Sequence, residues 1–382
     1  MPFWLVFHKK TMKNNIRYKA LSLTFIITTL LAVHPAFSQT KEKPMFIIAY
    51  YSGDGSDLAN YKTEQLTHII FSFLQLDGNK LAVDNTTDSI AITRLVALKK
   101  TNPKLKVIIS LGGWGGYKTC SKVFNTETGR LEFVQSTLNL FKTYHVDGLD
   151  LDWEYPALES VDRHQYLPED RQNFTFLVKA LRETVGPDYE LSFAAGGFSD
   201  YLLKSIEWQK VMPLVNYVNM MTYDLVNGNS KQTGHLTSLY STFEQRESTD
   251  HAVMFLDSIG VPMSKVVIGL AFYARTFNKV DDVNNGLYQK GKFSGYINFT
   301  DIDEKLGKSA GFEQFWDKKA KAPFAYNSTT KTFATYDNMQ SVYYKTKYAK
   351  EHKLGGIMFW ELSGDKVSGG LLDMIYETSK ER

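Results

Sequence analysis

Cysteine is almost absent from this chain of 382 residues. Cys120 is the only one, so an internal disulfide and a cluster of thiolate ligands for a metal ion are both excluded. A large excess of one charge is lacking as well, because 44 basic residues face 41 acidic ones. This balance does not indicate a basic surface, so no nucleic-acid partner is expected. With 43% apolar residues, stability must come from packing of a large core.

The N-terminal part of the chain lacks an apolar run long enough to span a bilayer. Its run from Ala20 to Val33 has 14 residues, whereas a spanning helix needs about 20. Basic residues precede this run and the small-residue stretch Ala36-Phe37-Ser38 follows it, an order typical of a cleaved export signal. We therefore predict a signal peptide over residues 1–38 and a secreted or periplasmic protein that has no membrane contact after cleavage. Met12 stays open as an alternative start.

Cleavage near Ser38 would also change the charge of the protein. It removes five basic residues and no acidic one, which leaves 39 basic and 41 acidic residues and a formal charge of −2. The mature chain is thus even less suited to an acidic polymer such as nucleic acid.

Short β-rich apolar runs alternate with longer stretches that carry helical patterning, which favours a parallel sheet built from βα units. Eight such units that close on themselves form a (β/α)8 TIM barrel, a fold of about 250 residues. The predicted strands are Met45–Tyr50, Thr67–Phe73, Lys106–Leu111, Val146–Trp153, Glu190–Ala195, Tyr217–Thr222, Val266–Phe272 and Gly356–Trp360.

About sixty residues, from Phe277 to Tyr336, stand between the seventh and eighth predicted strands where a helical crossover is expected. Alternating residues in Gly295–Phe299 and Thr332–Thr335 indicate a small antiparallel sheet beside a helix. We predict an α+β insertion subdomain over 277–336 and a catalytic barrel made of 39–276 and 337–382. The sequence shows no repeat or Ser/Pro-rich linker that would mark an attached binding module.

The fourth predicted strand carries three carboxylates at alternate positions, Asp150, Asp152 and Glu154. Because side chains of a strand alternate between its faces, all three share one face. Leu149 and Leu151 take the other, so the acids point into the barrel near its carboxyl end, where barrel enzymes keep their active sites. Repulsion among them should raise the pKa of Glu154, which could then donate a proton near neutral pH.

A cation site is the alternative interpretation of this acidic run. Calcium and magnesium loops need flexible backbone and several oxygen ligands, whereas Leu149, Leu151 and Trp153 indicate a buried strand. We therefore predict no metal site. Asp147 falls on the opposite parity, which indicates a structural role.

The run Asp147-Gly-Leu-Asp-Leu-Asp-Trp-Glu154 resembles the signature of glycoside hydrolase family 18. Three further motifs of that family stand in the right order at proposed strand ends, Ser110-Leu-Gly-Gly-Trp114, Met221-Thr-Tyr-Asp224 and Met358-Phe-Trp-Glu361. Tyr273-Ala-Arg-Thr-Phe277 and Tyr336-Asp337 resemble the two flanks of its insertion domain. The resemblance covers about Lys43 to Tyr376 and implies a chitinase that acts on chitin or N-acetylglucosamine oligosaccharides without a cofactor. A monomer is expected.

The resemblance also implies the roles of single residues. Glu154 would be the acid/base, Asp152 would hold the substrate N-acetyl group, Asp150 would tune Asp152, and Tyr223 would align the acetamido oxygen. That oxygen, not a protein side chain, would be the nucleophile, with retention of configuration. Trp360 would stack beneath the sugar at the cleavage point. The other implied substrate-binding residues are Asp224, Arg275, Trp114, Tyr155, Met221, Tyr50 and Ser110.

Two other functions stay open at this point. An endo-β-N-acetylglucosaminidase that acts on glycans would share the acids, although the insertion favours a chitinase. A chitin-binding lectin without activity would share the barrel, although such proteins arise when the acid is replaced, and Glu154 is intact.

Overall fold

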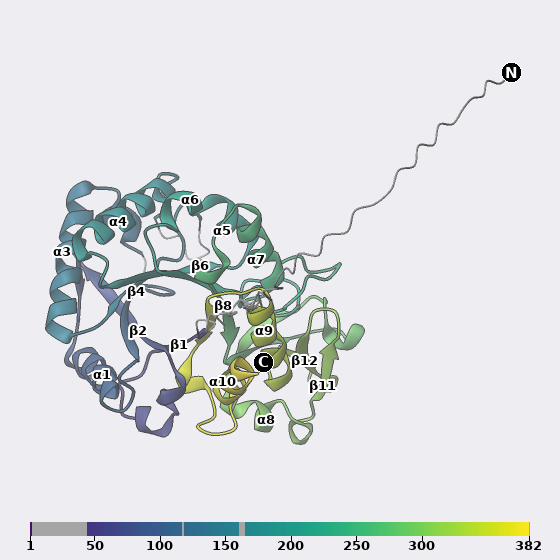
Figure 1. Cartoon of the computed structure of the whole chain (residues 1–382). Coiled ribbons are helices and arrows are strands. Elements are labelled where there is room, and N and C mark those ends of the chain that lie inside the picture. The colour runs from purple at the N-terminus through teal and green to yellow at the C-terminus, as the bar shows by residue number, and fades with distance from the viewer. Residues whose placement is uncertain (2–43, 117, 160–164, 382) are drawn as a thin grey trace, which may run out of the picture. The chain divides into compact units, whose positions relative to one another are not determined.

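A computed structural model describes Met1 and residues 44–116, 118–159 and 165–381 (Figure 1). By their contacts, Pro44–Arg382 form one unit. The predicted signal peptide lies outside the described residues, apart from Met1. In the part of the chain that the structure describes, no helix combines the length and the apolar character needed to cross a membrane.

Eight parallel strands form a closed barrel, which confirms the predicted fold. The barrel closes where β1 pairs with both β14 and β2. Its strands are β1 (Phe46–Tyr51), β2 (His68–Asp77), β4 (Lys106–Gly112), β5 (Gly148–Asp152), β6 (Glu190–Gly196), β7 (Tyr217–Met221), β8 (Val266–Ala271) and β14 (Gly356–Trp360).

Strand β2 runs past its predicted end at Phe73. It continues to Asp77 because it forms an antiparallel hairpin with β3 (Lys80–Ala82). The turn falls at Gly78, whose φ of 59° is a conformation that glycine adopts at little cost.

Helices lie around the outside of the barrel (Figure 1). Several begin at a residue whose side chain accepts a backbone N–H of the first turn, as Asn85, Thr126, Ser248 and Asn338 do. The helices are α1 (Thr86–Ala97), α2 (Cys120–Phe124), α3 (Glu127–Tyr144), α4 (Asp170–Val185), α5 (Ser199–Lys204), α6 (Trp208–Val211), α7 (Thr249–Ser258), α9 (Met339–Glu351) and α10 (Leu371–Lys380).

The core has two apolar layers that follow from the alternation of side chains along the strands. Leu149, Leu151 and Trp153 belong to the layer between strands and helices. The barrel interior holds a second cluster that includes Tyr50 and Met358. On β5, Asp150 and Asp152 occupy the positions that face the barrel interior, as the sequence predicts. Asp147 has the structural role expected of it, since its Oδ2 accepts the amide of Val107 at 2.7 Å.

A five-stranded antiparallel sheet stands between β8 and α9, in the strand order β10-β9-β13-β12-β11. It begins at Tyr273, directly after β8, and so precedes the predicted subdomain boundary at Phe277. The described elements are β9 (Tyr273–Asn278), β10 (Lys292–Asn298), α8 (Ile302–Lys305), β11 (Glu313–Asp317), β12 (Ala322–Asn327) and β13 (Thr332–Thr335). The domain limits at 277 and 336 stay a prediction.

Candidate active site

Three buried carboxyl groups follow β5 toward its carboxyl end. Asp150 and Asp152 lie within the strand, and Glu154 is the second residue after its end. Their exposed fractions are 0%, 4% and 8%. A barrel interior that admits three carboxyl groups is costly in free energy unless they are hydrogen-bonded or share protons.

Asp150 is held by four donors from four other strands. Tyr50 Oη and Ser110 Oγ donate to its Oδ2 at 3.0 and 2.9 Å. Ser192 Oγ and Asn219 Nδ2 donate to its Oδ1 at 2.7 and 3.2 Å. Burial raises the pKa of Asp150, while hydrogen bonds from these four side chains lower it. The arrangement fixes the innermost acid rigidly.

Ser192 and Asn219 are site residues that sequence reasoning missed. Each is a buried polar residue with an apolar residue on either side in its strand. That pattern is the signal that could have found them, because a polar side chain inside a barrel requires a polar partner there. Tyr50 and Ser110, which the family resemblance implies as substrate-binding residues, are buried and donate to Asp150.

Asp152 lies between the other two carboxyl groups along the strand. Its Oδ1 is buried and has no hydrogen-bond partner among the described residues. Burial raises the pKa of Asp152 well above its ordinary value, and the nearby charges of Glu154 and Asp150 add to this effect. A buried acceptor without a donor is a site that favours a ligand N–H or O–H.

Burial raises the pKa of Glu154 to about 7, although a hydrogen bond from Tyr155 partly offsets this increase. The charge of Asp224 raises it further. The direction agrees with the expectation from the sequence, but the largest cause is loss of hydration rather than repulsion within the acidic run. A carboxyl group of this kind is partly protonated at neutral pH and suits general acid/base chemistry.

The end of β7 brings Met221 and Tyr223 to the same region. Both are buried. Tyr223 Oη contacts Met358 Sδ at 4.0 Å. Burial raises the pKa of Tyr223, and the charges of Asp152 and Glu154 contribute to the shift, so this hydroxyl lies within electrostatic reach of both acids.

Asp224 and Arg275 are paired with each other. Arg275 Nε donates to Asp224 Oδ1 at 2.6 Å, and Arg275 Nη2 donates to Oδ2. Tyr273 Oη, which sequence reasoning did not assign, also donates to Asp224 Oδ1 at 2.8 Å. The pair thus joins the segment after β7 to the first strand of the insertion.

Aromatic rings surround the acids. Trp360, at the end of β14, is stacked on Phe73 with ring centroids 5.4 Å apart and lies 6.0 Å from the ring of Tyr50. Tyr155 packs edge-on against Phe198 and Tyr201. Trp114 follows β4 and is 58% exposed.

Two further tryptophans make packing contacts away from the acidic run. Trp208 is buried and donates to Leu202 O, and Trp316 stacks on Tyr344. Within the described ranges, no group of three or more His, Cys, Asp or Glu residues is arranged to hold a metal ion.

The curated proteins similar to this chain include two bacterial chitinases. The chain is 36% identical to Chitinase A1 of Niallia circulans, over 76% of this chain and 45% of that protein. It is 32% identical to Chitinase B of Serratia marcescens, over 83% of this chain and 77% of that protein. The chain therefore spans less than half of the first relative's length and about three quarters of the second's.

Among solved structures, a glycoside hydrolase family 18 N-acetylglucosaminidase from Paenibacillus barengoltzii superposes with a TM-score of 0.80 at 33% identity. The match covers 87% of this chain and 99% of that one. The family model described as Glycosyl hydrolases family 18 matches residues 46–365, which include every strand of the barrel and all three acids. The barrel fold, the acidic run on β5 and the curated relatives all indicate the same family, and the chain belongs to glycosyl hydrolase family 18.

Proposed function

We propose that this chain hydrolyses β-1,4 linkages between N-acetylglucosamine units in chitin and its oligosaccharides, with retention of configuration. One observation carries the proposal: Glu154, whose pKa burial raises to about 7, lies two residues beyond a buried carboxyl whose Oδ1 has no partner among the described residues. The names of two relatives, Chitinase A1 and Chitinase B, support the substrate class.

In the first step, the Glu154 carboxyl donates its proton to the glycosidic oxygen as the bond from that oxygen to C1 breaks. The carbonyl oxygen of the sugar's own acetamido group forms a new bond to C1 from the opposite face. The products are a shortened saccharide with a new hydroxyl, an oxazolinium ion and a Glu154 carboxylate. Such positioned acid catalysis contributes roughly 10²–10⁴ in rate.

In the second step, the Glu154 carboxylate takes a proton from a water molecule whose oxygen attacks C1. The bond from C1 to the acetamido oxygen breaks, the acetamido group is restored and Glu154 is protonated again. Two inversions at C1 retain the configuration, and one water is consumed per linkage.

Asp152 and Tyr223 would align the acetamido group. The free Oδ1 of Asp152 would accept the acetamido N–H, which gives this buried oxygen its missing donor. The Tyr223 hydroxyl would donate to the acetamido oxygen. Asp150 would keep Asp152 in place, since its own two oxygens are already held by four side chains.

Aromatic and charged side chains would bind the sugar rings. A pyranose has an apolar C–H face and a polar rim, so the Trp360 ring would take the face. Asp224 and Arg275 would bind hydroxyl groups at the rim, each retaining hydrogen-bonding capacity beyond the contacts it makes with the other. Trp114, exposed after β4, would stack on a further sugar.

A time course of products from chitin hexamer tests the activity. The expected result is shorter N-acetylglucosamine oligomers with the β-anomer formed first, and nearly complete loss of turnover in Glu154→Gln. Fully deacetylated oligomers should resist cleavage because they lack the internal nucleophile. A sugar trapped covalently on a protein carboxylate would contradict the mechanism.

The hexamer assay, together with an assay of N-glycan release from a glycoprotein, separates the other two functions. Release of N-glycans from a glycoprotein without cleavage of the hexamer would identify an endo-β-N-acetylglucosaminidase. Binding of the hexamer without any turnover would identify a lectin.

Export belongs to the proposal as well, on the order of charged, apolar and small residues in 1–38. Intact-mass analysis of protein recovered outside the cytoplasm should give a chain that begins near Gln39. Retention of residues 1–38 would contradict it.

A further inference from the structure

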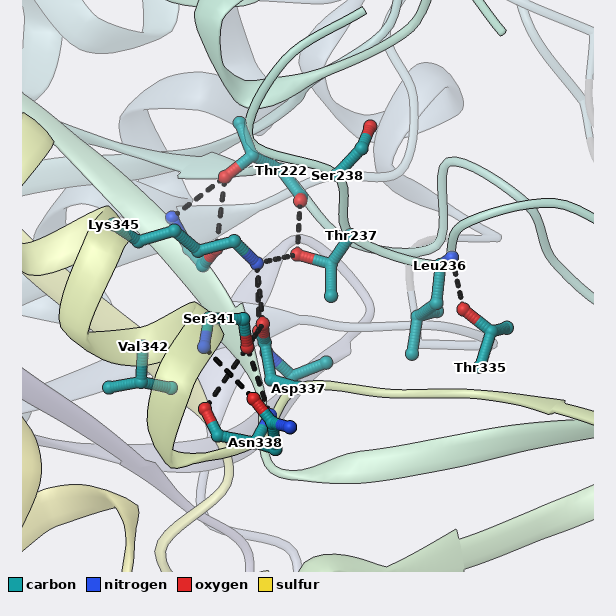
Figure 2. A network of polar contacts seen from close by, with 12 residues as sticks. Thr222, Leu236, Thr237, Ser238, Thr335, Asp337, Asn338, Ser341, Val342 and Lys345 are labelled. Atoms are coloured by element: carbon teal, nitrogen blue, oxygen red, sulfur yellow. Dashed lines mark hydrogen bonds and ion pairs between the residues drawn. The ribbon is translucent and has the colours of Figure 1, made fainter. Parts of the chain in front are cut away.

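Lys345 and Asp337 form an ion pair with no exposure to solvent (Figure 2). Lys345 Nζ lies 2.7 and 2.9 Å from the two carboxylate oxygens of Asp337. Lys345 belongs to α9, and Asp337 precedes the N-cap of that helix. A buried pair is costly to desolvate, and an apolar pair of the same size often serves stability as well or better. None of the proposed chemical steps uses these two charges.

The third hydrogen bond of Lys345 leads toward the active site. Its Nζ donates to Thr237 Oγ1 at 2.6 Å, and that hydroxyl donates its only proton to Thr222 O at 2.8 Å (Figure 2). The Thr222 hydroxyl in turn donates to Gly269 O and accepts Gly269 N, both at 3.0 Å. Thr222 is the residue directly before Tyr223 and Asp224.

Asp337 connects the same cluster to the strand that leads to Arg275. Its Oδ2 accepts the amide of Ala271, the last residue of β8, at 3.1 Å. Its Oδ1 also accepts the Ser341 hydroxyl at 2.6 Å. The ion pair is therefore bonded to both segments that carry the Asp224–Arg275 pair.

The segment after Thr222 contains a residue in an uncommon backbone conformation. Asp224 has a φ of 55°, in the left-handed region that non-glycine residues seldom adopt. Leu225 N donates to Leu236 O at 3.0 Å, and Leu236 N donates to Thr335 Oγ1 at 2.9 Å (Figure 2). The loop from Thr222 to Thr237 is thus fixed at both ends, and Thr237 is its link to the buried charges.

We propose that Lys345, with Asp337 as its counter-ion, is a positioning residue that acts through Thr237 and Thr222 to hold Tyr223 and Asp224 in their catalytic geometry. This inference rests on the proposed function, because it assigns Tyr223 the alignment of the acetamido group. A shift of the Tyr223 hydroxyl by about 1 Å can cost roughly 100-fold in rate even when its cause lies far from the reacting atoms.

Thr237→Val tests the link while it leaves the ion pair in place. The expected result is a fall in kcat of roughly tenfold or more on a chitin oligosaccharide, with KM changed by less than about threefold. Thr237→Ser keeps the hydroxyl and should restore kcat to within about threefold of wild type.

Thr346→Val is the matched control. Thr346 is the next residue of α9 and is equally buried, but its hydroxyl donates to Val342 O within the helix. The substitution is the same and should leave kcat and KM unchanged. An unchanged kcat in Thr237→Val, an equal loss in Thr346→Val, or no recovery in Thr237→Ser would each overturn the inference.

Lys345→Met extends the test to the charge itself by a double-mutant cycle. If Lys345 acts through Thr237, the double variant Lys345→Met/Thr237→Val should have the kcat of Thr237→Val alone, whereas fully additive losses would contradict the relay. Should Lys345→Met fail to fold, the Thr237 variants and their control still decide the question. Absence of turnover in wild type would instead overturn the proposed function, and this inference with it.

Discussion

Arg275 binds Asp224 through two nitrogens, with Nε 2.6 Å from Oδ1 and Nη2 on Oδ2. The two residues are 51 positions apart in the sequence, and they join the loop after a barrel strand to the first strand of the insertion. Their pairing fixes the orientation of Asp224 beside Tyr223, which burial alone would not do.

Arg275→Lys should lower kcat/KM roughly tenfold while the melting temperature changes little. Lysine keeps the charge but cannot reproduce the two parallel hydrogen bonds of the guanidinium, and the pair is partly exposed, so its effect on stability is small. Steady-state kinetics and thermal unfolding measure the two effects. Arg171→Lys, on the outer helix α4, is the control and should change neither; a purely thermal effect of Arg275→Lys would contradict the assignment.

The pH dependence of kcat/KM should follow the protonation of Glu154. Since the first step needs its proton and its pKa is raised to about 7, the rate should fall tenfold per pH unit well above that value. A pH–rate profile on a fluorogenic chitobioside measures it. A profile that stays flat up to pH 9 would remove Glu154 from the role of proton donor.

Glu154→Gln should stabilise the fold at neutral and higher pH. In wild type, the unfolded chain releases this proton near the ordinary glutamate pKa, while the folded chain keeps it up to about 7, so the stability contributed by this group is lost as pH rises between the two values. Glutamine does not titrate. The variant should therefore gain about 3 kcal/mol over wild type above pH 7, with little gain at pH 4. Denaturant unfolding at both pH values tests this, and an equal gain at both would contradict it.

Trp360→Ala should raise KM or lower kcat far more than it lowers stability. Trp360 is the last residue of β14, and its ring is stacked on Phe73 rather than enclosed in the outer core. Phe359→Ala is the matched comparison, because that neighbouring ring is fully buried on the other face and stacks on Phe272. It should cost about 3–5 kcal/mol of stability. If Trp360→Ala unfolds the protein to the same degree without a kinetic effect of its own, Trp360 is a packing residue.

The barrel and its acidic strand follow from local pattern. Alternation along 149–154 assigns leucines to one face and acids to the other, because the side-chain period of a strand is two whatever surrounds it. Eight such runs separated by helical stretches specify the closed sheet, and each predicted strand is present. The direction of the Glu154 pKa shift agrees with the expectation from the sequence, but its largest cause is burial rather than repulsion within the acidic run.

Which side chains meet was decided by the tertiary structure. Ser192 is the register partner of Asp150 on the neighbouring strand β6, and Asn219 lies one strand further, on β7, so the pairing of distant strands brings both to Asp150. Likewise, Lys345 on an outer helix reaches Thr222 only through Thr237, across more than a hundred residues of sequence. Periodicity determines the face on which a side chain lies, since it depends on local backbone geometry alone. The residue that a side chain contacts depends on how distant segments pack, and a local sequence pattern carries no information about that packing.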